Sequence, residues 1–504
     1  MSRPPSGPPP ATRGRPGSFS KALARDRLGV PAVLFFVLAG IAPLTVAAGV
    51  IPSAFATTGL TGIPAAFIVV AVILAVFATG YMAMSRRITH SGAFYAFITR
   101  GLGRPAGVAA ALIALVAYTF LQTGLYGALG PAAQAEAAAH LNVHQPWWFW
   151  ALIAWALVTI LGQLRVDITG KVLGVLLTAE LAVVVTETVL GLAHPAGGHL
   201  SFATLSPARL GSAGFATFGV LAVVAVLGFV GFEFGAGLSE EARQPKRTIP
   251  AATYLALGVI AVVYAGASWA MAAHAGTSHV GAAAGKLGPG LLFTLGGSAW
   301  LSQAGQLLFM TSLFAAALAF HNVVWRYVFA LGRENVLPAA LGRTGAANIP
   351  RAASLAQSAT GLAVITVYAL GGWPPMTDLF FWLGTTGGFG IVILLALTSA
   401  AVIAFFARDP DDETAWRRLI APAVAFVLLA GIVVLAVTHY ATLLGTPPGS
   451  PAAWALPACY PAAAVVGLAW AVALRARRRE VYQRIGLGAH AVTGQLAPVA
   501  SEAA

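Results

Sequence analysis

Charged residues are scarce in this sequence. Asp, Glu, Lys and Arg make up only 9% of its 504 residues, whereas a typical soluble protein contains about 25%. Hydrophobic residues make up 58% of the chain. A water-soluble globular fold does not account for this composition, and we expect an integral membrane protein.

Familiar catalytic and cofactor motifs are also missing. The chain contains no HExxH, no CxxC pair, no GxxxxGK[ST] and no credible nucleophile triad. These absences argue against an ATP-driven pump and against a membrane enzyme, so we expect no enzymatic activity, no cofactor and no bound metal. The single cysteine, Cys459, cannot form a disulfide within the chain.

Long apolar runs are what the sequence has instead. Runs of about 20 residues are long enough to cross a bilayer as helices. Twelve such runs lie at roughly 31–54, 59–84, 106–131, 147–164, 170–193, 215–238, 250–274, 300–326, 352–372, 378–407, 417–440 and 452–474. We therefore predict an all-α integral membrane protein with twelve transmembrane helices.

The positions of Lys and Arg predict the orientation, because short loops rich in these residues stay cytoplasmic. With the N-terminus inside, 27 of the 29 fall in cytoplasmic segments, and only Arg209 and Lys286 lie outside. We expect a multi-pass protein of the cytoplasmic (plasma) membrane with both termini cytoplasmic. The net charge of +13 is spread over seven cytoplasmic edges, so we expect the lipid bilayer and not nucleic acid as a partner. The excess of Arg over Lys hints at a bacterial source.

The chain divides around these runs. Residues 1–27 are rich in Pro, Gly, Ser and Arg and should form a disordered cytoplasmic tail. Spans one to five occupy 28–193, spans six to ten 215–407, and the last two 417–474, before a basic cytoplasmic tail at 475–504. We expect disorder after Arg479 as well, and loops or short surface helices in the longest gaps between spans.

Two spans are expected to break at membrane depth, where backbone stays helical unless it lines a cavity or packs on protein. In the first span, Pro43 removes a backbone donor and clashes with the preceding turn. In the sixth, VLGFVGFEFGAG at 226–237 crowds four glycines together. Close helix packing explains either pattern alone. Breaks at matching positions of two five-helix sets favour an inverted repeat with a substrate site between them.

Three motifs in order carry a family resemblance. GFVGFEFGAGLSEEARQPKRTIP at 228–250, RYVFALGRENVLPAAL at 326–341 and SGAFYAFITRGLGRPAG at 91–107 stand at the sixth span, the eighth-span exit and the loop after span two. Over residues 28–475 the chain resembles the amino acid–polyamine–organocation (APC) superfamily, specifically its amino acid permease branch. The resemblance implies a 5+5 inverted-repeat (LeuT-like) core with broken helices 1 and 6.

The resemblance also implies site residues. It places substrate binding at the two breaks, on Ala42, Pro43, Leu44, Thr45, Val46, Phe229, Val230, Gly231 and Phe232, with Phe229 covering the substrate. It assigns support of the breaks to Gly40, Gly49, Gly228 and Glu233. The family usually has Gly-x-Gly at the first break. Here Pro43 offers no backbone donor, so a substrate carboxylate would be held differently.

Two acids inside span five are candidates for ion coupling. Glu180 and Glu187 are seven residues apart and so lie on nearly one helical face. Acids buried in spans are candidate proton carriers, with structural pairing as the alternative. By resemblance, Glu180 falls near the sodium position of sodium-coupled relatives, where a proton could replace the metal ion. We predict proton coupling through Glu180, with Glu187 as the second candidate.

The sequence thus predicts a secondary active transporter that moves a small amino acid with H⁺ by alternating access. Alternatives within transport are amines, polyamines or nucleobases as substrates, and sodium as the coupling ion. A facilitator or channel and a transporter-like sensor remain alternatives of other classes. Polar or aromatic residues of spans three, eight and ten could also face the pocket, namely Gln122, Tyr126, Ser312, His321, Asp378 and Trp382. The sequence gives no indication of the oligomeric state.

Overall fold

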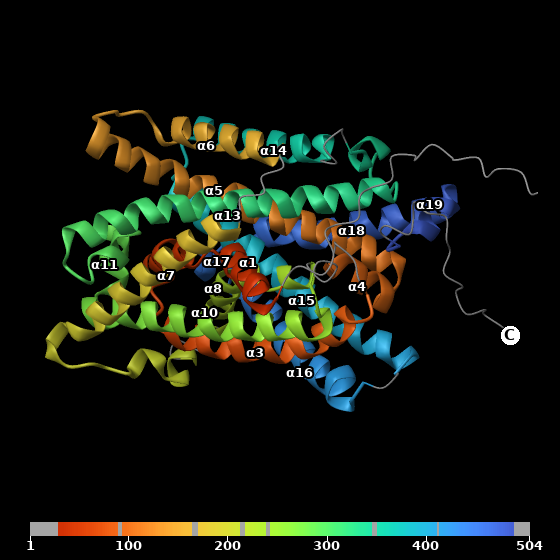
Figure 1. Ribbon diagram of the computed structural model, residues 1–504, viewed down its shortest axis with the longest axis horizontal. Helices are drawn as coiled ribbons and strands as arrows, with labels where there is room; N and C mark the ends of the chain where they lie inside the picture. The colour runs from red at the N-terminus through yellow and green to blue at the C-terminus, as the bar shows by residue number, and fades with distance from the viewer. Residues whose placement is uncertain are drawn as a thin grey trace, which may run out of the picture.

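The computed structural model describes residues 29–88, 93–163, 170–211, 217–237, 242–344, 350–410 and 413–487. Every regular element in these residues is a helix, so the all-α prediction is confirmed. The long helices run side by side along the long axis of the molecule (Figure 1). The short helix α11 (Val280–Leu287) lies at one end, and α4 (Ala93–Leu102) and α19 (Arg479–Arg484) lie at the other.

Ten described segments are long and apolar enough to cross a membrane. They are Val30–Thr58, Ile63–Ser85, Arg104–Leu141, Gly174–Ala193, Lys246–Ala275, Ala299–Arg333, Arg351–Gly371, Pro375–Arg408, Trp416–Thr438 and Pro451–Arg477. Two shorter apolar helices, Trp147–Gly162 and Thr217–Phe229, coincide with the predicted fourth and sixth spans. The chain is a multi-pass membrane protein. The count of twelve depends on the two shorter helices and stays a prediction.

The first half of the chain contains the helices up to α7. They are α1 (Val30–Ile41), the π-helix η1 (Thr45–Val50), α2 (Ile51–Thr58), α3 (Ile63–Ser85), α4, α5 (Arg104–Leu141), α6 (Trp147–Gly162) and α7 (Gly170–Ala193). Three short 3₁₀ turns follow, η2 (Ala196–Gly198), η3 (Ala203–Leu205) and η4 (Pro207–Gly211). Loops or short surface helices were predicted for this gap, and its described part contains these short turns.

The second half begins at α8 (Thr217–Phe229). The remaining elements are α9 (Phe234–Gly237), α10 (Pro245–Ala275), α11, α12 (Gly290–Phe293), α13 (Ala299–Arg333), η5 (Ala339–Gly342), α14 (Arg351–Gly371), η6 (Pro375–Phe381), α15 (Trp382–Arg408), η7 (Trp416–Ile420), α16 (Ala421–Thr438), α17 (Tyr440–Leu444), α18 (Pro451–Arg477) and α19. The seventh span was predicted to begin at about 250, but α10 begins at Pro245, so Pro250 lies inside the helix.

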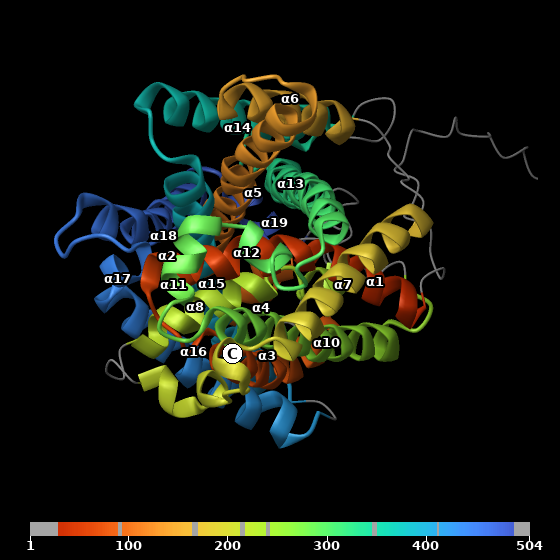
Figure 2. The same ribbon diagram turned by 90° about the vertical axis from the view of Figure 1, so that its left-hand side faces the viewer.

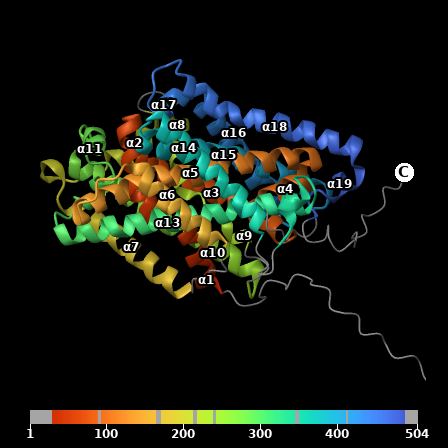
Figure 3. The same ribbon diagram turned by 90° about the horizontal axis from the view of Figure 1, so that it is seen from above.

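The core lies where α8 and α15 pass through the middle of the bundle. Seen from the end that carries α11, these two helices lie inside a ring of α3, α10, α7, α13, α5, α18 and α16 (Figure 2). Helix α7 and helix α18 lie on opposite edges of the molecule (Figure 3). Helix α15 packs against α5, α16, α4 and α8. The short helix α8 is therefore surrounded by protein, and nearly all of its side chains are buried.

The C-terminal segment is ordered as far as the structure describes it. Disorder was predicted after Arg479, yet α19 forms there and Ile485 is buried. The Gly486 N–H donates to Glu334 Oε2 at 3.0 Å and to the Tyr95 hydroxyl at 3.1 Å. Tyr95 in turn donates to the Glu334 carboxylate. The prediction of disorder is wrong for this segment, because it finds partners on α4 and α13 that its composition does not reveal.

Replacing Glu334 by Ala should destabilise the protein, because the buried Tyr95 O–H and Gly486 N–H both lose their carboxylate acceptor. Each such hydrogen bond contributes about 0.5–1.5 kcal/mol, and the Gly486 N–H keeps its bond to the Tyr95 hydroxyl. Thermal unfolding of the detergent-solubilised protein measures the effect. Glu480→Ala is the control, since Glu480 is exposed on α19, and a surface substitution changes stability by about 0.5 kcal/mol or less. Equal unfolding temperatures for the two variants would show that the hydrogen bonds of Glu334 to Tyr95 and Gly486 do not stabilise the protein.

Candidate functional site

The first predicted break is present after α1, which ends at Ile41. Ala42 has a left-handed backbone with φ 52°, a conformation that costs a non-glycine residue about 1–3 kcal/mol. The following Pro43 disfavours the α conformation for the residue before it. The chain then continues as the π-helix η1 from Thr45. The proline therefore interrupts the helix at Ala42.

The second break separates α8 from α9. Helix α8 ends at Phe229 and α9 begins at Phe234. Between them Gly231 has a φ of +115°, which side-chain-bearing residues rarely adopt. Two tight turns carry the chain across, with Phe232 N–H donating to the Phe229 carbonyl and Phe234 N–H to the Gly231 carbonyl. Glycine at 231 is thus required by the backbone itself.

The two breaks touch each other through backbone. A Cβ on Gly231 would lie 2.9 Å from the Gly40 carbonyl carbon and 2.9 Å from the Ile41 nitrogen. A Cβ on Gly40 would lie 2.7 Å from the Phe234 ring. Segments almost 200 residues apart in sequence therefore meet at the centre of the bundle, with no room for a side chain at either glycine.

The other two predicted glycines also make room. A Cβ on Gly49 would lie 2.9 Å from the Phe380 ring, and one on Gly228 would lie 2.8 Å from the Phe67 ring. Both glycines lie inside helical segments. Both glycines therefore allow close packing beside the breaks. At each of them an aromatic ring occupies the space that a side chain would need.

Glu233 lies directly behind the second break and is only 3% exposed. Its Oε1 accepts the Tyr118 hydroxyl at 2.7 Å, and its Oε2 accepts the Gly231 N–H at 2.9 Å. The Tyr81 hydroxyl reaches the Glu233 carbonyl at 3.4 Å. The side chain of Glu233 thus ties the interrupted backbone to α5.

Replacing Tyr118 by Phe should therefore destabilise the protein by about 1–3 kcal/mol, because it leaves the buried Glu233 Oε1 without its hydrogen-bond donor. Tyr126→Phe is the matched control on the same helix. Its hydroxyl accepts only a neutral donor, Gln122 Nε2, at 2.9 Å, and such a bond contributes about 0.5–1.5 kcal/mol. Thermal unfolding in detergent compares the two. A larger loss for Tyr126→Phe than for Tyr118→Phe would contradict the role of Glu233.

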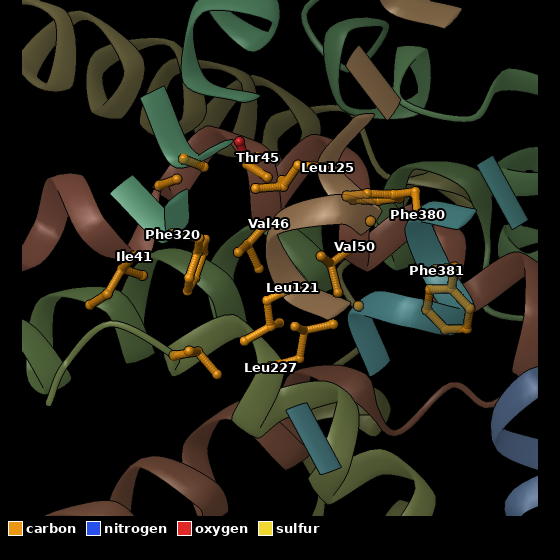
Figure 4. A pocket seen from close by; sticks show the side chains of 15 residues that line it. Ile41, Thr45, Val46, Val50, Leu121, Leu125, Leu227, Phe320, Phe380 and Phe381 are labelled. Atoms are coloured by element: carbon orange, nitrogen blue, oxygen red, sulfur yellow. The ribbon is translucent and has the colours of Figure 1, made fainter. Parts of the chain in front are cut away.

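A cavity of about 40 Å³ lies between the breaks. Its wall consists of Ile41, Ala42, Thr45, Val46, Val50, Leu121, Gly124, Leu125, Leu227, Val230, Ala316, Phe320, Phe380, Phe381 and Gly384 (Figure 4). Among the described residues that line it, Thr45 carries the one polar side chain and none is charged. At roughly 10–15 Å³ for each water, the cavity holds only a few waters. A larger solute would need side chains or helices to move.

The predicted binding residues divide into two groups. The cavity is lined by Ala42, Thr45, Val46 and Val230, but its lining does not include Pro43, Leu44, Phe229, Gly231 or Phe232. The Phe229 ring packs against Phe67 and Tyr264, at centroid distances of 6.1 and 6.2 Å. The aromatic rings on the cavity wall are instead Phe320, Phe380 and Phe381.

Sequence reasoning missed the wall supplied by α5, α13 and α15. On α5 it selected Gln122 and Tyr126, while the residues of this helix that line the cavity are Leu121, Gly124 and Leu125. Gln122 instead accepts a hydrogen bond from Gln357 Nε2 on α14, at 3.0 Å. On α13 it selected His321, which contacts Ser354 at 2.9 Å, while the adjacent Phe320 lines the cavity. Two further choices, Trp382 and Asp378, do not line the cavity. Trp382 Nε1 donates to the Leu444 carbonyl, and the Asp378 carbonyl accepts the Tyr368 hydroxyl.

Glu180 is connected to the cavity by a short chain of hydroxyls. It is 6% exposed, and its Oε2 accepts the Ser312 hydroxyl from α13 at 2.8 Å. Ser312 Oγ accepts the Thr45 hydroxyl at 3.1 Å, and Thr45 lines the cavity. This carboxyl group is therefore linked through two hydroxyls to the cavity wall beside the first break.

Glu187 lies elsewhere on α7. It is fully buried, and its Oε2 accepts the Gly296 N–H at 2.7 Å, in the turn between α12 and α13. Its Oε1 has no hydrogen-bond partner among the described residues. Within the part of the chain that the structure describes, no hydrogen bond joins Glu187 to Glu180 or to the cavity.

Comparison with known proteins is consistent with this geometry. A family model described as "Amino acid permease" matches residues 32–483. The chain is also similar to the "Branched-chain amino acid permease BcaP" of Lactococcus lactis subsp. cremoris, with 26% identity over 184 residues. That match spans 36% of this chain and 39% of the relative.

Proposed function

Because the chain belongs to the amino acid permease family, we propose that it carries amino acids with apolar side chains across the cytoplasmic membrane, coupled to protons. The observation that supports this most is the cavity between the two helix breaks. Its wall is apolar except for Thr45. Amino acid transport follows from the family, and the side-chain preference and the coupling ion are the added proposals.

The cavity wall favours a substrate with an aliphatic side chain over a substrate with a charged one. Val46, Leu121 and Phe320 offer apolar surface, and burying apolar area contributes about 25 cal/mol per Å². A lysine or polyamine would place a positive charge where no charged side chain lines the wall, and an unpaired buried charge is strongly disfavoured. This argues against the amine and polyamine alternatives. The similarity to a branched-chain amino acid permease points the same way.

The broken helices supply the groups for the constant part of an amino acid. Ends of interrupted helices present N–H groups and carbonyls that are free to bind carboxylate and ammonium groups. Ala42 and Val230 line the cavity. Their N–H groups donate to the Leu38 and Leu227 carbonyls in the conformation described, so these turns would open to bind a substrate carboxylate, and the Thr45 hydroxyl adds a side-chain donor. The substrate's side chain would then point toward the apolar wall.

The hydroxyl chain offers a mechanism for coupling. An ionised Glu180 only accepts hydrogen bonds, whereas a protonated one can donate. In the first case Ser312 donates to Glu180 and Thr45 donates to Ser312. In the second case both bonds can reverse, so that the Thr45 O–H turns toward the cavity. Protonation of Glu180 would thus change what the cavity presents to a substrate.

Alternating access follows from the same two breaks. The cavity is too small for an amino acid in the conformation described, so binding requires the half-helices to move about Ala42 and Gly231. If the cavity opens toward the two sides in turn, an inward proton gradient would drive import of the substrate together with a proton. Breaks in touching helices allow that motion without breaking regular helical hydrogen bonds.

Uptake into proteoliposomes tests the proposal. The panel is leucine, isoleucine, valine, lysine and putrescine, with sodium absent and with or without an inward proton gradient. We expect the three aliphatic amino acids to accumulate only with the gradient, and lysine and putrescine to stay out. Accumulation that requires sodium would contradict proton coupling, and uptake that stops at equal concentrations would indicate a facilitator.

A further inference from the structure

Helix α15 contains four glycines close together, and packing explains three of them. Gly387, Gly388 and Gly390 each have a neighbouring atom 3.0 Å or less from the position of an added Cβ. For Gly387 the neighbours include the Ala117 carbonyl oxygen at 2.8 Å. Side chains at these three positions would push α15 away from the elements packed against it.

Gly384 is different. An added Cβ there would meet only Leu227 Cδ2, at 3.7 Å, which is ordinary van der Waals contact. The residue lies inside α15 without a positive φ, so the backbone does not require glycine. A glycine inside a helix costs about 1 kcal/mol relative to alanine. Neither packing nor conformation accounts for glycine at this position.

What Gly384 does provide is space in the cavity. It lines the wall together with Phe380 and Phe381, which lie about one helical turn before it, and with Leu227 from α8. A methyl group at 384 would lie against Leu227 inside this wall. The missing side chain therefore leaves room of about one methyl group in the place that the substrate's side chain would occupy.

We infer that Gly384 sets the upper size limit for the substrate's side chain, an inference that rests on the proposed function. The room of about one methyl group at 384 adds to the space for the substrate's side chain, and filling it favours a smaller side chain. A single methylene in a hydrophobic pocket changes specificity by about 10–200-fold. A methyl group added to the wall should reduce the preference for the larger substrate by a factor of similar size.

The test is the ratio of kcat/KM for leucine to kcat/KM for alanine, measured by uptake into proteoliposomes for Gly384→Ala and the parent protein. We expect the ratio to fall by about tenfold or more. Gly431→Ala is the matched control, because Gly431 lies exposed on α16 and an added Cβ there meets no atom within 4 Å. The control should keep the parent ratio.

A second variant probes the same space in the opposite direction. Leu227→Ala removes the atom that the new methyl group would meet, so it should raise uptake of phenylalanine relative to leucine. An unchanged leucine-to-alanine ratio in Gly384→Ala, or an unchanged phenylalanine-to-leucine ratio in Leu227→Ala, would overturn the inference while leaving the proposed function intact. Failure of the parent protein to take up any amino acid would overturn the proposed function instead.

Discussion

Replacing Glu180 by Gln should abolish concentration of substrate against its gradient. Glutamine keeps the size of the side chain, and its oxygen can still accept the Ser312 hydroxyl, but it cannot take up and release a proton. The variant should exchange internal for external leucine yet never accumulate it. Proteoliposomes with an inward proton gradient measure accumulation, and preloaded vesicles without a gradient measure exchange.

Glu136→Gln is the control for Glu180→Gln. Glu136 lies near the end of α5 and pairs with His140 at 3.4 Å, remote from the hydroxyl chain. This variant should accumulate leucine as the parent protein does. If Glu180→Gln still concentrates leucine to the parent level, Glu180 is not the coupling residue and its hydrogen bonds are structural.

Replacing Gly231 by Ala should impair both folding and transport. A left-handed or otherwise strained φ costs a non-glycine residue about 1–3 kcal/mol. The added methyl group would also lie 2.9 Å from the backbone of Gly40 and Ile41, so the two breaks would have to separate. We expect a lower unfolding temperature in detergent and loss of leucine uptake.

Gly431→Ala again provides the comparison for Gly231→Ala. Alanine favours a helix over glycine by about 1 kcal/mol, and no neighbour obstructs a methyl group at Gly431, so its unfolding temperature should stay or rise. A Gly231→Ala protein that unfolds at the parent temperature and transports leucine normally would show that the contact between the breaks is dispensable.

The helix breaks could be predicted from sequence because they arise from backbone chemistry. Pro43 lacks an N–H and restricts the residue before it, and Gly231 adopts a φ that other residues avoid. These properties belong to the residues themselves and need no knowledge of neighbours. The same holds for Glu180, since a carboxyl group in an apolar run stands out by its type alone.

The cavity wall could not be predicted in this way. Leu121 and Phe320 are apolar residues among many others in largely apolar spans, so nothing in their type separates a cavity residue from a lipid-facing one. Polar neighbours such as Gln122 attract notice, but they satisfy their hydrogen bonds on other helices. Which face of a span meets the site depends on packing between segments far apart in sequence.

The partners of Glu180 were hidden for the same reason. Ser312 and Thr45 are common residues in membrane helices, and each commonly bonds to its own backbone. Only the packing of α7 against α1 and α13 brings their hydroxyls into line with the carboxylate. The same holds for the C-terminal segment. Ile485 is buried, although the polar residues around it in the sequence give no indication of burial.

The measurement that tests the account most directly is the internal pH of proteoliposomes when leucine is added outside. The vesicles contain a pH-sensitive dye, no sodium is present, and a potassium ionophore keeps the membrane potential near zero. The account predicts that the interior acidifies as leucine enters, and that lysine causes no change. Entry of leucine at constant internal pH would contradict proton-coupled transport.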